Sequence, residues 1–569
     1  QGQYGYLKRH KKKVIISIIS TGIIIVAGVA LSLFLFRTTK TVMIIVPILT
    51  ALPFSKQVVA LILCGKFHWL TEEEYKRTET EIPEDIRRDL LYDVSISRYE
   101  GMIYFPVVLV RDGRMIFYYN GSFNSKIKDK NELKKLAIQE IDKAREEIIA
   151  LGTDIYQHPE TGYREFRTTD LLAEKLTALG LNVQKEIAYT GCKATLGEKK
   201  DGPTLAVMGE LDSLLCSAHK DANPENGYMH ACGHNIQVSV MYAVAAALVR
   251  AGILPELDGN VEFLAVPAEE YIELDYRSRL KKNGEIKYYS GKAECIYRGV
   301  FDDIDMAIMA HNYPISQDGY KCAAASAWNG FIGKQIRFIG KPAHAGGAPW
   351  DGINALNMAD LAMTGMHFQR ETFRDDDKVR MHGIITKGGE VVNAVPDDVE
   401  MEYTVRARNI TALKDANAKV NRAIRGAAIT IGGKAVVVDT PGQMPLKYNK
   451  GLADLYSENA RAFYKEEEIL PYLDTTASTD AGDVSLLMPV LHSLSSGITG
   501  GLHSKEYTIV DTEDAYITPA KIFVCMVIDL LYDGAGTAQK ILADYTPELT
   551  KDQYLEMLDS MENTFEYEA

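Results

Sequence analysis

Two long apolar runs open the chain before any amphipathic pattern begins. The first, Val14 to Phe36, carries no charged residue, and at about 1.5 Å per residue a helix of this length crosses the roughly 30 Å hydrocarbon layer of a membrane. The second, Thr41 to Cys64, contains Pro47, Pro53 and Lys56, so we expect a kinked or re-entrant helix. The pattern predicts a membrane hairpin in residues 1–65, with one or two transmembrane helices.

The orientation of this hairpin follows from its flanking charges. A secretory signal is the alternative for the first run, which is long for one. More basic residues precede the run (Lys8, Arg9, Lys11, Lys12, Lys13) than follow it (Arg37, Lys40). The positive-inside tendency therefore places the amino end in the cytoplasm. With two spans the rest of the chain returns there, so we expect a membrane-anchored protein whose catalytic part faces the cytoplasm.

A small module and a linker follow. Residues 66–120 predict an α+β module, because "MIYFPVVLVRDGRMIFYYNG" holds two apolar runs around an Asp-Gly turn, as a β-hairpin does. Residues 121–131 are a polar linker. Helical and strand patterns alternate after it.

Three strand-like apolar runs in the larger part end on polar residues: "TLAVMGELD" (204–212), "NVEFLAVPAEE" (260–270) and "DMAIMAHN" (305–312). Strands separated by helices favour a parallel or mixed sheet that is buried on both faces. In such sheets chemistry gathers beyond the carboxyl ends of the strands. We therefore expect Asp212, Glu269, Glu270 and His311 to meet at one edge.

The stretch "YMHACGHN" (228–235) adds a thiol and an imidazole. Cys232 and His234 would point to different sides of a helix, so we place them in the turn before the helix "IQVSVMYAVAAALVRAG". Gly233 gives that turn its freedom, and Asn235 is the expected N-cap. A buried structural cysteine beside a capping histidine is an equally simple explanation of this pair alone.

The pair Glu269 and Glu270 narrows the choice. Two adjacent carboxylates at a buried strand end repel each other unless a cation or a shared proton relieves them, whereas a solvated pair would need neither. A cysteine–histidine nucleophile would leave both glutamates without a purpose. Thiolate, imidazole and carboxylate together suit zinc or a similar divalent ion.

Composition limits the partners. The chain has 569 residues, 46% of them hydrophobic, and a net charge of −14, so nucleic acid is not an expected partner. The seven cysteines follow no regular spacing, which indicates reduced thiols rather than a disulfide framework.

The ordered set of motifs resembles the di-metal amidohydrolases of peptidase family M20, in the branch of aminobenzoyl-glutamate hydrolases and Xaa-Arg dipeptidases. The motifs run from about residue 131 to 535: "HPETGYREFRTTDLLAEKLTALG", "GELD", "MHACGHN", "PAEE", "GKPAHAGGAPWDGINALNMA", "GGEVVNAVPDDVEMEYTVRAR", "STDAGDVS" and "GLHSKEY". The resemblance implies an α/β, di-metal aminopeptidase-like catalytic domain (132–326 and 441–546). It also implies an inserted α+β lid (327–440) with a four-stranded sheet and two helices, through which a homodimer forms. Residues 547–569 remain as an acidic tail.

The resemblance also implies a metal site. The metal ligands would be Cys232, His234, Glu270, His311 and His503. Glu269 would be the general base, and Asp212 would orient a ligand. The ion would be zinc, or alternatively manganese, with one or two ions per subunit. The substrate would be a small amide: an N-acyl amino acid, a dipeptide or an aminobenzoyl-glutamate-like compound.

Lid residues complete the implied site. In relatives the equivalent of His344 reaches the active site of the partner subunit and stabilises the oxyanion. Asn393 and Arg406 would bind the substrate carboxylate, and Arg408 lies on the same face of the expected strand. The resemblance alone favours Arg406 over Arg408.

The chain also departs from the family. Many relatives carry "HACGHD" followed shortly by another histidine, where this chain has Asn235 and Gln237. Other branches have His-x-Asp where this chain has Glu210-Leu211-Asp212, which leaves the count of ions open. A membrane-anchored binding or scaffold protein with an inactive hydrolase domain is the alternative function, although the ligand set and the base are complete.

Overall fold

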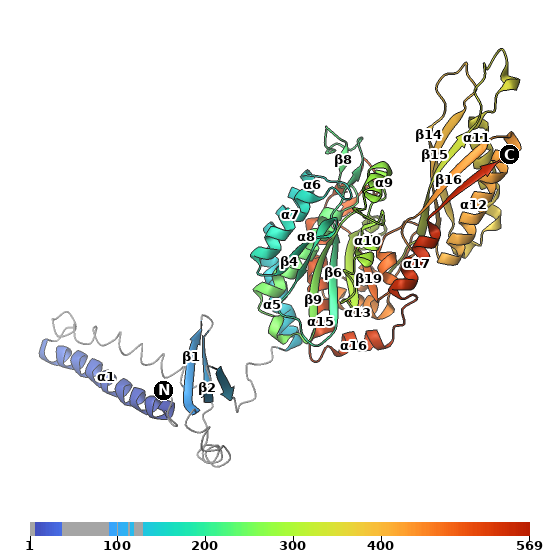
Figure 1. Ribbon diagram of the computed structural model, residues 1–569. Helices are drawn as coiled ribbons and strands as arrows, with labels where there is room; N and C mark the ends of the chain where they lie inside the picture. Colours follow the sequence, from blue (N-terminus) through green and yellow to red (C-terminus); the bar gives the residue numbers. More distant parts are fainter. Residues whose placement is uncertain (1–5, 37–89, 99–100, 112–113, 119–128) are drawn as a thin grey trace. The chain divides into compact units, whose positions relative to one another are not determined.

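The computed structural model describes residues 6–36, 90–98, 101–111, 114–118 and 129–569 (Figure 1). The chain divides into two compact units, residues 1–127 and 128–569. The second unit holds every residue of the predicted site.

The first unit contains a helix and a small antiparallel sheet. The helix is α1 (Tyr6–Phe36), and the sheet has the order β1 (Leu90–Arg98), β2 (Gly101–Arg111), β3 (Arg114–Tyr118). β2 and β3 pair with Arg111 opposite Arg114, which confirms the hairpin predicted around the Asp-Gly turn.

The membrane hairpin predicted for residues 1–65 is not supported. α1 covers the first apolar run, but among the residues that the structure describes no helix combines the length and the apolar character that crossing a membrane requires. The second run, 41–64, lies outside the described residues.

An eight-stranded mixed sheet forms the centre of the second unit. Its order is β17 (Ile469–Leu470), β11 (Cys322–Ala323), β19 (Val490–Ser495), β10 (Met306–Asn312), β6 (Thr204–Glu210), β9 (Asn260–Val266), β5 (Thr190–Thr195), β4 (Asn182–Ala188). The four central strands, β19, β10, β6 and β9, are parallel. β5 and β4 continue the sheet antiparallel. The predicted parallel or mixed sheet is confirmed.

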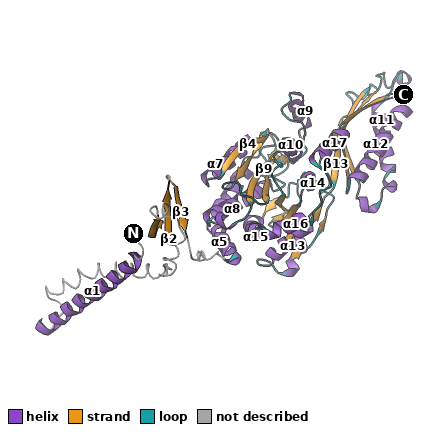
Figure 2. Ribbon diagram, turned by 60° about the horizontal axis from the view of Figure 1, so that its bottom comes forward, coloured by secondary structure: helices purple, strands orange, loops and turns teal. Residues whose placement is uncertain are grey.

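Both faces of this sheet are covered by other elements. Alternate residues of each central strand point to opposite faces, and both sets are buried. On β6, Leu205 and Val207 enter one buried cluster, and Ala206 and Met208 enter the other. Figure 2 shows helices on both sides of these strands. The first face packs against α5 (Lys130–Lys143), α6 (Arg145–Gln157), α7 (Phe166–Ala178), α8 (His234–Arg250), α13 (Lys450–Ala460), α15 (Thr518–Leu531) and α16 (Gly536–Ala543). The second packs against α10 (Gly291–Tyr297), α14 (Ala481–Ser485) and α17 (Lys551–Met561).

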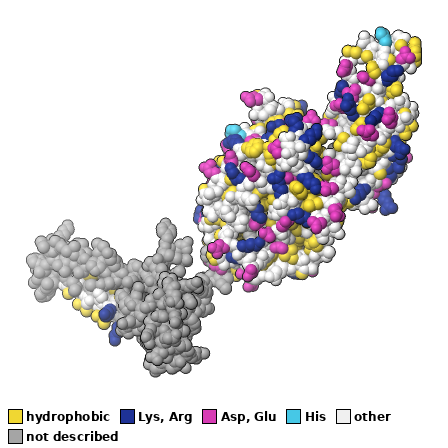
Figure 3. All heavy atoms as spheres, viewed as in Figure 1, with side chains coloured by type: hydrophobic (Ala, Val, Ile, Leu, Met, Phe, Trp, Pro, Cys, Tyr) yellow, Lys and Arg dark blue, Asp and Glu magenta, His cyan; other side chains and the backbone are white. Residues whose placement is uncertain are grey.

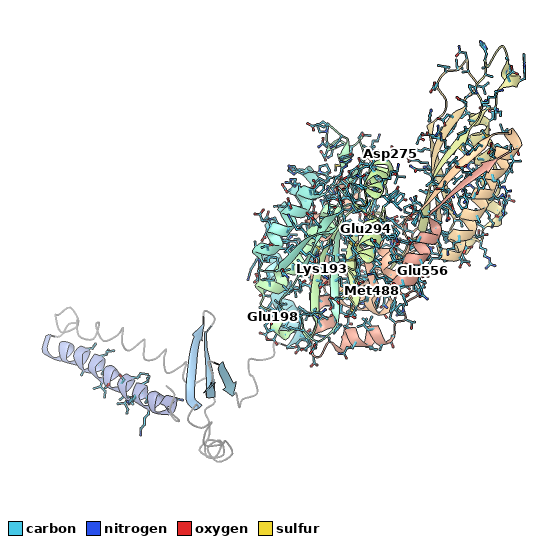
Figure 4. All side chains as sticks on the ribbon, in the orientation of Figure 1. Lys193, Glu198, Asp275, Glu294, Met488 and Glu556 are labelled. Atoms are coloured by element: carbon cyan, nitrogen blue, oxygen red, sulfur yellow. The ribbon has the colours of Figure 1, made fainter. Side chains whose placement is uncertain are left out.

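Short elements surround the sheet. α9 (Leu274–Lys282) and α10 belong to the charged segment between β9 and β10, and Figure 4 labels Asp275 on α9 and Glu294 on α10. Three two-stranded pairs complete the unit: β7 (Leu214–Leu215) with β8 (Tyr228–Met229), β12 (Ser326–Ala327) with β18 (Leu473–Asp474), and β20 (Ile498–Thr499) with β21 (Thr508–Ile509).

A second, antiparallel sheet of the same unit projects from the catalytic part and forms the lid (Figure 1). Its order is β14 (Arg380–Lys387), β15 (Asp398–Ala407), β13 (Gly330–Ile339), β16 (Lys434–Pro441), β22 (Asn563–Glu568). Helices α11 (Ala355–Phe368) and α12 (Ile410–Ile431) share a buried apolar cluster with the sheet. The fold therefore has five lid strands where the resemblance implies four.

The fifth strand comes from the segment expected to be only an acidic tail. β22 pairs antiparallel with β16 from Lys434–Glu568 to Asp439–Asn563. α17, just before it, buries Tyr554 and Leu558 against the second face of the catalytic sheet. Residues 551–568 thus join the catalytic part to the lid.

Leu558→Ala tests whether this C-terminal segment contributes to stability. Leu558 is fully buried, so its truncation should lower the free energy of unfolding by about 2–5 kcal/mol. Glu556 lies on the same helix with an exposed side chain (Figure 4). Glu556→Ala should therefore change the free energy of unfolding by less than about 0.5 kcal/mol. Urea denaturation measures both, and equal midpoints would show that the segment is not packed as described.

Candidate metal centre

The carboxyl ends of adjacent parallel strands deliver the polar side chains to one edge of the sheet. Glu210 is the last residue of β6, and His311 lies one residue before the end of β10. Glu269 and Glu270 follow β9 after a short turn. Because β10, β6 and β9 are neighbours, these side chains lie at the same edge.

The turn before α8 brings in the thiol and the next imidazole. Gly233 has φ +88°, in the left-handed region that glycine adopts without strain. α8 begins at His234, two residues earlier than expected, so His234 is the first residue of the helix and not part of the turn before it. Asn235 lies inside the helix and donates from Nδ2 to the Gly152 carbonyl and to Tyr516 Oη, each at 3.1 Å. The expectation that Asn235 caps the helix is therefore wrong, because its side chain points toward these buried partners.

Two of the histidines have their tautomers fixed by backbone carbonyls. His234 Nδ1 lies 2.8 Å from the carbonyl oxygen of Asp212, and His311 Nδ1 lies 2.6 Å from that of Asn312. A carbonyl only accepts, so each Nδ1 carries a proton, and each Nε2 presents a lone pair when its ring is neutral, as it is in a metal ligand.

These lone pairs converge with the thiol and a carboxylate. Cys232 Sγ lies 3.5 Å from His311 Nε2 and 3.4 Å from His503 Nε2. His503 Nε2 lies 3.0 Å from Glu270 Oε1. His503 has φ +57°, an uncommon conformation for a residue with a side chain, which places its ring at this point.

Three sets of side chains bring one donor atom each to within 4.8 Å of one another: Cys232, His234 and His311; Cys232, Glu270 and His503; and Glu210, His234 and Glu269. Cys232 belongs to the first two sets and His234 to the first and third. Asp212 supports the arrangement, since its Oδ1 lies 3.1 Å from His234 Nδ1 and its Oδ2 accepts the Glu270 amide at 2.9 Å.

The electrostatics favour ionised ligands. Burial and the Glu270 carboxylate oppose ionisation of Cys232, but the charges of His503, His234 and His311 outweigh them and lower the pKa of the thiol to about 6. Burial likewise opposes ionisation of Glu270, yet His503 lowers the pKa of this carboxyl to about 2. The Glu270 charge in turn raises the pKa of His503 to about 12.

Glu269 is different from its neighbour. Burial, together with the Glu210 and Glu270 charges, raises the pKa of Glu269 well above its ordinary value. Gln443 donates from Nε2 to the Glu269 carbonyl at 2.7 Å and to Glu269 Oε1 at 3.0 Å. One carboxyl oxygen is thereby held, and the other is left for chemistry.

A cavity of about 570 Å³ opens over this cluster. Its walls come from both the catalytic part and the lid, and include Tyr271, Trp328, Phe331, Arg406, Gln443 and Ser478. Arg406 donates from Nη1 to Ser478 Oγ at 2.8 Å, with its guanidinium 5.1 Å from the centre of the Phe331 ring. Arg408 instead donates to Asp474 Oδ1 at 2.6 Å and does not line the cavity.

Two residues of the predicted site, His344 and Asn393, lie outside the cavity of their own chain. His344 and Asn393 are exposed on adjacent lid loops, where the Ala345 amide donates to the Asn393 carbonyl at 3.0 Å. Neither lines the cavity.

The donor set fits a divalent metal ion. His234 Nε2 is buried and makes no hydrogen bond, although Glu210 Oε2 lies only 3.1 Å away. Thiolate, imidazole and carboxylate donors are those that zinc prefers, and the carboxylates also suit manganese.

Sequence reasoning missed several residues around the cluster. Gln443, which holds Glu269, lies where the chain returns from the lid, and Lys292, which contacts Glu210, lies inside the charged segment before β10. No local signal marks either one. Glu210 was inside the "GELD" motif, where its strand-end position was the available signal.

Comparison with known proteins agrees with the family resemblance of the sequence motifs. The sequence model of peptidase family M20/M25/M40 matches residues 206–529, more than half of the chain. The chain is 29% identical over 447 residues to the Xaa-Arg dipeptidase of Mus musculus, covering 74% of this chain and 94% of that protein. It is 29% identical over 300 residues to one of the subunits of the p-aminobenzoyl-glutamate hydrolase of Escherichia coli, covering 51% and 56%. A Bacillus subtilis structure, described as a dinuclear metal binding peptidase, superposes with a TM-score of 0.52 at 20% identity over 68% of this chain and 99% of that one, which shows a shared fold.

Proposed function

The chain belongs to peptidase family M20/M25/M40, and on that premise we propose that it hydrolyses the amide bond of an N-acyl amino acid, a dipeptide or an aminobenzoyl-glutamate-like compound. The observation that carries the proposal is the convergence of a sulfur, three imidazoles and a carboxylate in overlapping sets beside Glu269. All of these groups except the buried His234 line one cavity. The substrates in the names of the two relatives, a dipeptide and an aminobenzoyl-glutamate, belong to the same chemical class.

The metal ligands in this proposal are Cys232, His234, Glu270, His311 and His503. Because Cys232 belongs to two of the convergent sets, its thiolate can serve two neighbouring positions, so two ions are compatible with one sulfur. Zinc is the first choice, because zinc accepts thiolate, imidazole and carboxylate together. Asp212 orients His234 through the ring nitrogen that faces away from the cluster.

Glu269 is the proton carrier of the proposed reaction. When bound, a divalent ion supplies Lewis acidity that polarises the amide carbonyl and makes a nearby water easier to deprotonate. Glu269 takes the proton from that water at its free oxygen and then donates it to the leaving amine. The raised pKa of Glu269 suits a carboxyl that must hold a proton between the two steps. A divalent ion bound beside it would favour the ionised form that accepts the proton in the first step, and Gln443 keeps the carboxyl oriented.

Arg406 binds the carboxylate of the substrate's amino-acid half. Its guanidinium lines the cavity, and burial lowers its pKa although Glu269 and Glu270 oppose that shift. The planar fork of arginine matches two carboxylate oxygens. Arg408 is already paired with Asp474, which favours Arg406 on geometric grounds.

A second copy of the chain supplies His344 and Asn393. Both lie outside the cavity of their own subunit, and the lid exposes large apolar side chains suited to an interface: Trp350, Phe368, Ile384, Val391 and Val392. Figure 3 shows hydrophobic side chains on the surface of the lid. His344 Nδ1 accepts the amides of Gly346 and Gly347, so Nε2 carries the proton and can donate to an oxyanion.

Mixing two inactive variants tests this arrangement. His344→Ala should lower kcat about 10²–10³-fold, because it removes one oxyanion donor. Mixing it with Glu269→Gln should restore about a quarter of wild-type activity, because half of randomly formed dimers contain one intact site. Each variant incubated alone is the control. A mixture that recovers nothing, while light scattering shows dimers, would place His344 in its own subunit's site.

The cytoplasmic placement of the catalytic unit remains a prediction. It is consistent with the thiols, because the six cysteines of the described residues, Cys192, Cys216, Cys232, Cys295, Cys322 and Cys525, are all free.

The proposed function is tested by a substrate screen under metal control. Purified protein is stripped with a chelator, reloaded with Zn²⁺ or Mn²⁺, and offered N-acyl amino acids, dipeptides and aminobenzoyl-glutamate, with free amino acid as the readout. We expect release only in the reloaded samples. Saturable binding of these compounds without release under any metal would indicate the binding or scaffold protein instead.

A further inference from the structure

A chain of buried charged groups runs behind His234. The Lys292 side chain is 0% exposed, and its Nζ donates to Glu210 Oε1 at 2.6 Å and also to Asp480. Glu210 and Asp480 are equally buried. Burying charges is costly unless they are paired. This group holds two carboxylates but only one ammonium, so one buried negative charge is not balanced within the group.

Gln237 fixes the same carboxylate from the other side. Its Nε2 donates to Glu210 Oε2 at 2.8 Å, and its Oε1 accepts the Glu210 amide at 3.2 Å. Gln237 is one of the two positions at which the chain departs from the histidine-bearing motif of many relatives. The departure therefore has a structural counterpart, since a glutamine can both donate to and accept from Glu210.

The held carboxylate faces an acceptor. Glu210 Oε2 lies 3.1 Å from His234 Nε2, and His234 Nδ1 donates a proton to the Asp212 carbonyl. Nε2 is buried without a hydrogen-bond partner. When the ring is neutral these two atoms are both acceptors, so they repel each other unless a second proton on the ring or a bound cation lies between or beside them.

A cation satisfies both atoms, because Glu210, His234 and Glu269 bring one donor atom each to within 4.8 Å of one another, and His234 also belongs to the set with Cys232 and His311. We propose that Glu210 is a metal ligand outside the five that the family resemblance implies, and that it binds the ion carried by His234. Lys292 and Gln237 are positioning residues that hold the Glu210 carboxylate toward that ion. The inference rests on the proposed function, in that the cluster must bind a metal.

Asp480 provides a matched control. Glu210 and Asp480 are the two carboxylates paired with Lys292, and both are fully buried, but of these two only Glu210 contacts His234. Asp480 instead accepts from Ser290 Oγ and the Lys292 amide, each at 2.9 Å. Removing either charge disturbs Lys292 similarly, whereas only the Glu210 change alters the metal cluster.

The experiment compares the wild type with Glu210→Gln and Asp480→Asn in the full chain, stripped of metal. Competition titration with Zn²⁺ gives the dissociation constant, X-ray absorption gives the number of nitrogen and oxygen ligands, and thermal melting without metal gives stability. We expect similar losses of stability in both variants. We also expect at least about tenfold weaker zinc binding and one ligand fewer in Glu210→Gln, and near wild-type binding in Asp480→Asn.

Two results would overturn the inference while leaving the proposed function standing. The first is unchanged zinc binding and ligand number in Glu210→Gln. The second is an equal loss of zinc affinity in both variants, because that would show a general effect of losing a buried charge. A wild type that binds no zinc or manganese would instead overturn the proposed function and the inference together.

Discussion

Glu269→Gln should lower kcat about 10²–10⁴-fold, the usual contribution of a general acid–base group, with bound metal unchanged. Glutamine has the size of glutamate and can still accept the hydrogen bond from Gln443, so the fold and the cavity should persist. It cannot take a proton from water at neutral pH. Steady-state kinetics with metal analysis of the same sample measures both effects.

Glu262→Gln is the matched control for this variant. Glu262 lies on β9, the strand that leads to Glu269, and it is largely buried. Its carboxylate pairs with Lys193 Nζ at a distance of 2.5 Å (Lys193 is labelled in Figure 4). Glu262 does not line the cavity. We expect near wild-type kcat. A Glu269→Gln enzyme with kcat within about threefold of the wild type would remove Glu269 from the proton-transfer role.

Cys232→Ala should remove most of the bound metal and, with it, the activity. Its sulfur belongs to two of the three convergent sets, so its loss leaves the imidazoles and the carboxylate without the donor they share. Elemental analysis after dialysis should show a large fall in metal per chain. Activity should fall below about 1% of wild type, because a divalent ion contributes several kcal/mol of transition-state stabilisation.

This variant also separates the metal site from a thiol nucleophile. A nucleophilic cysteine would lose activity on substitution while the protein kept its metal content. Cys295→Ala serves as the control, because Cys295 is fully buried on α10 and its pKa is raised, mainly by burial. It should keep both metal and activity, since its sulfur belongs to none of the three sets.

The sequence predicted the parts of the site that local pattern encodes. The apolar runs 204–212, 260–270 and 305–312 predicted three strands, which end at Glu210, Val266 and Asn312 in the structure. The packing rules of parallel sheets predicted that the polar residues at these ends lie together. The turn at Gly233 was predicted for the same reason, because its backbone requirement is local.

Other features depend on partners far away in the sequence. Whether Arg406 or Arg408 reaches the cavity is decided by the pairing of Arg408 with Asp474, which no strand pattern reveals. Lys292 reads as one charge in a charged segment, and only tertiary structure places it between Glu210 and Asp480.

The C-terminal segment shows the same limit on a larger scale. Its acidic composition predicted a solvated tail, because composition alone does not show which strand edge is free. In the fold, β22 covers the edge of β16, and alternate residues of β22, Phe565 and Tyr567, pack toward the lid core. Such pairing joins segments that are distant in the chain, so it becomes visible only with the structure.

Anomalous X-ray diffraction at the zinc edge, on crystals of the zinc-loaded protein, locates the bound metal. We expect a strong peak bounded by Cys232, His234 and His311, and a second peak bounded by Cys232, Glu270 and His503 if two ions bind. Strong peaks confined to other parts of the molecule, with these side chains free of metal, would contradict the proposed metal site.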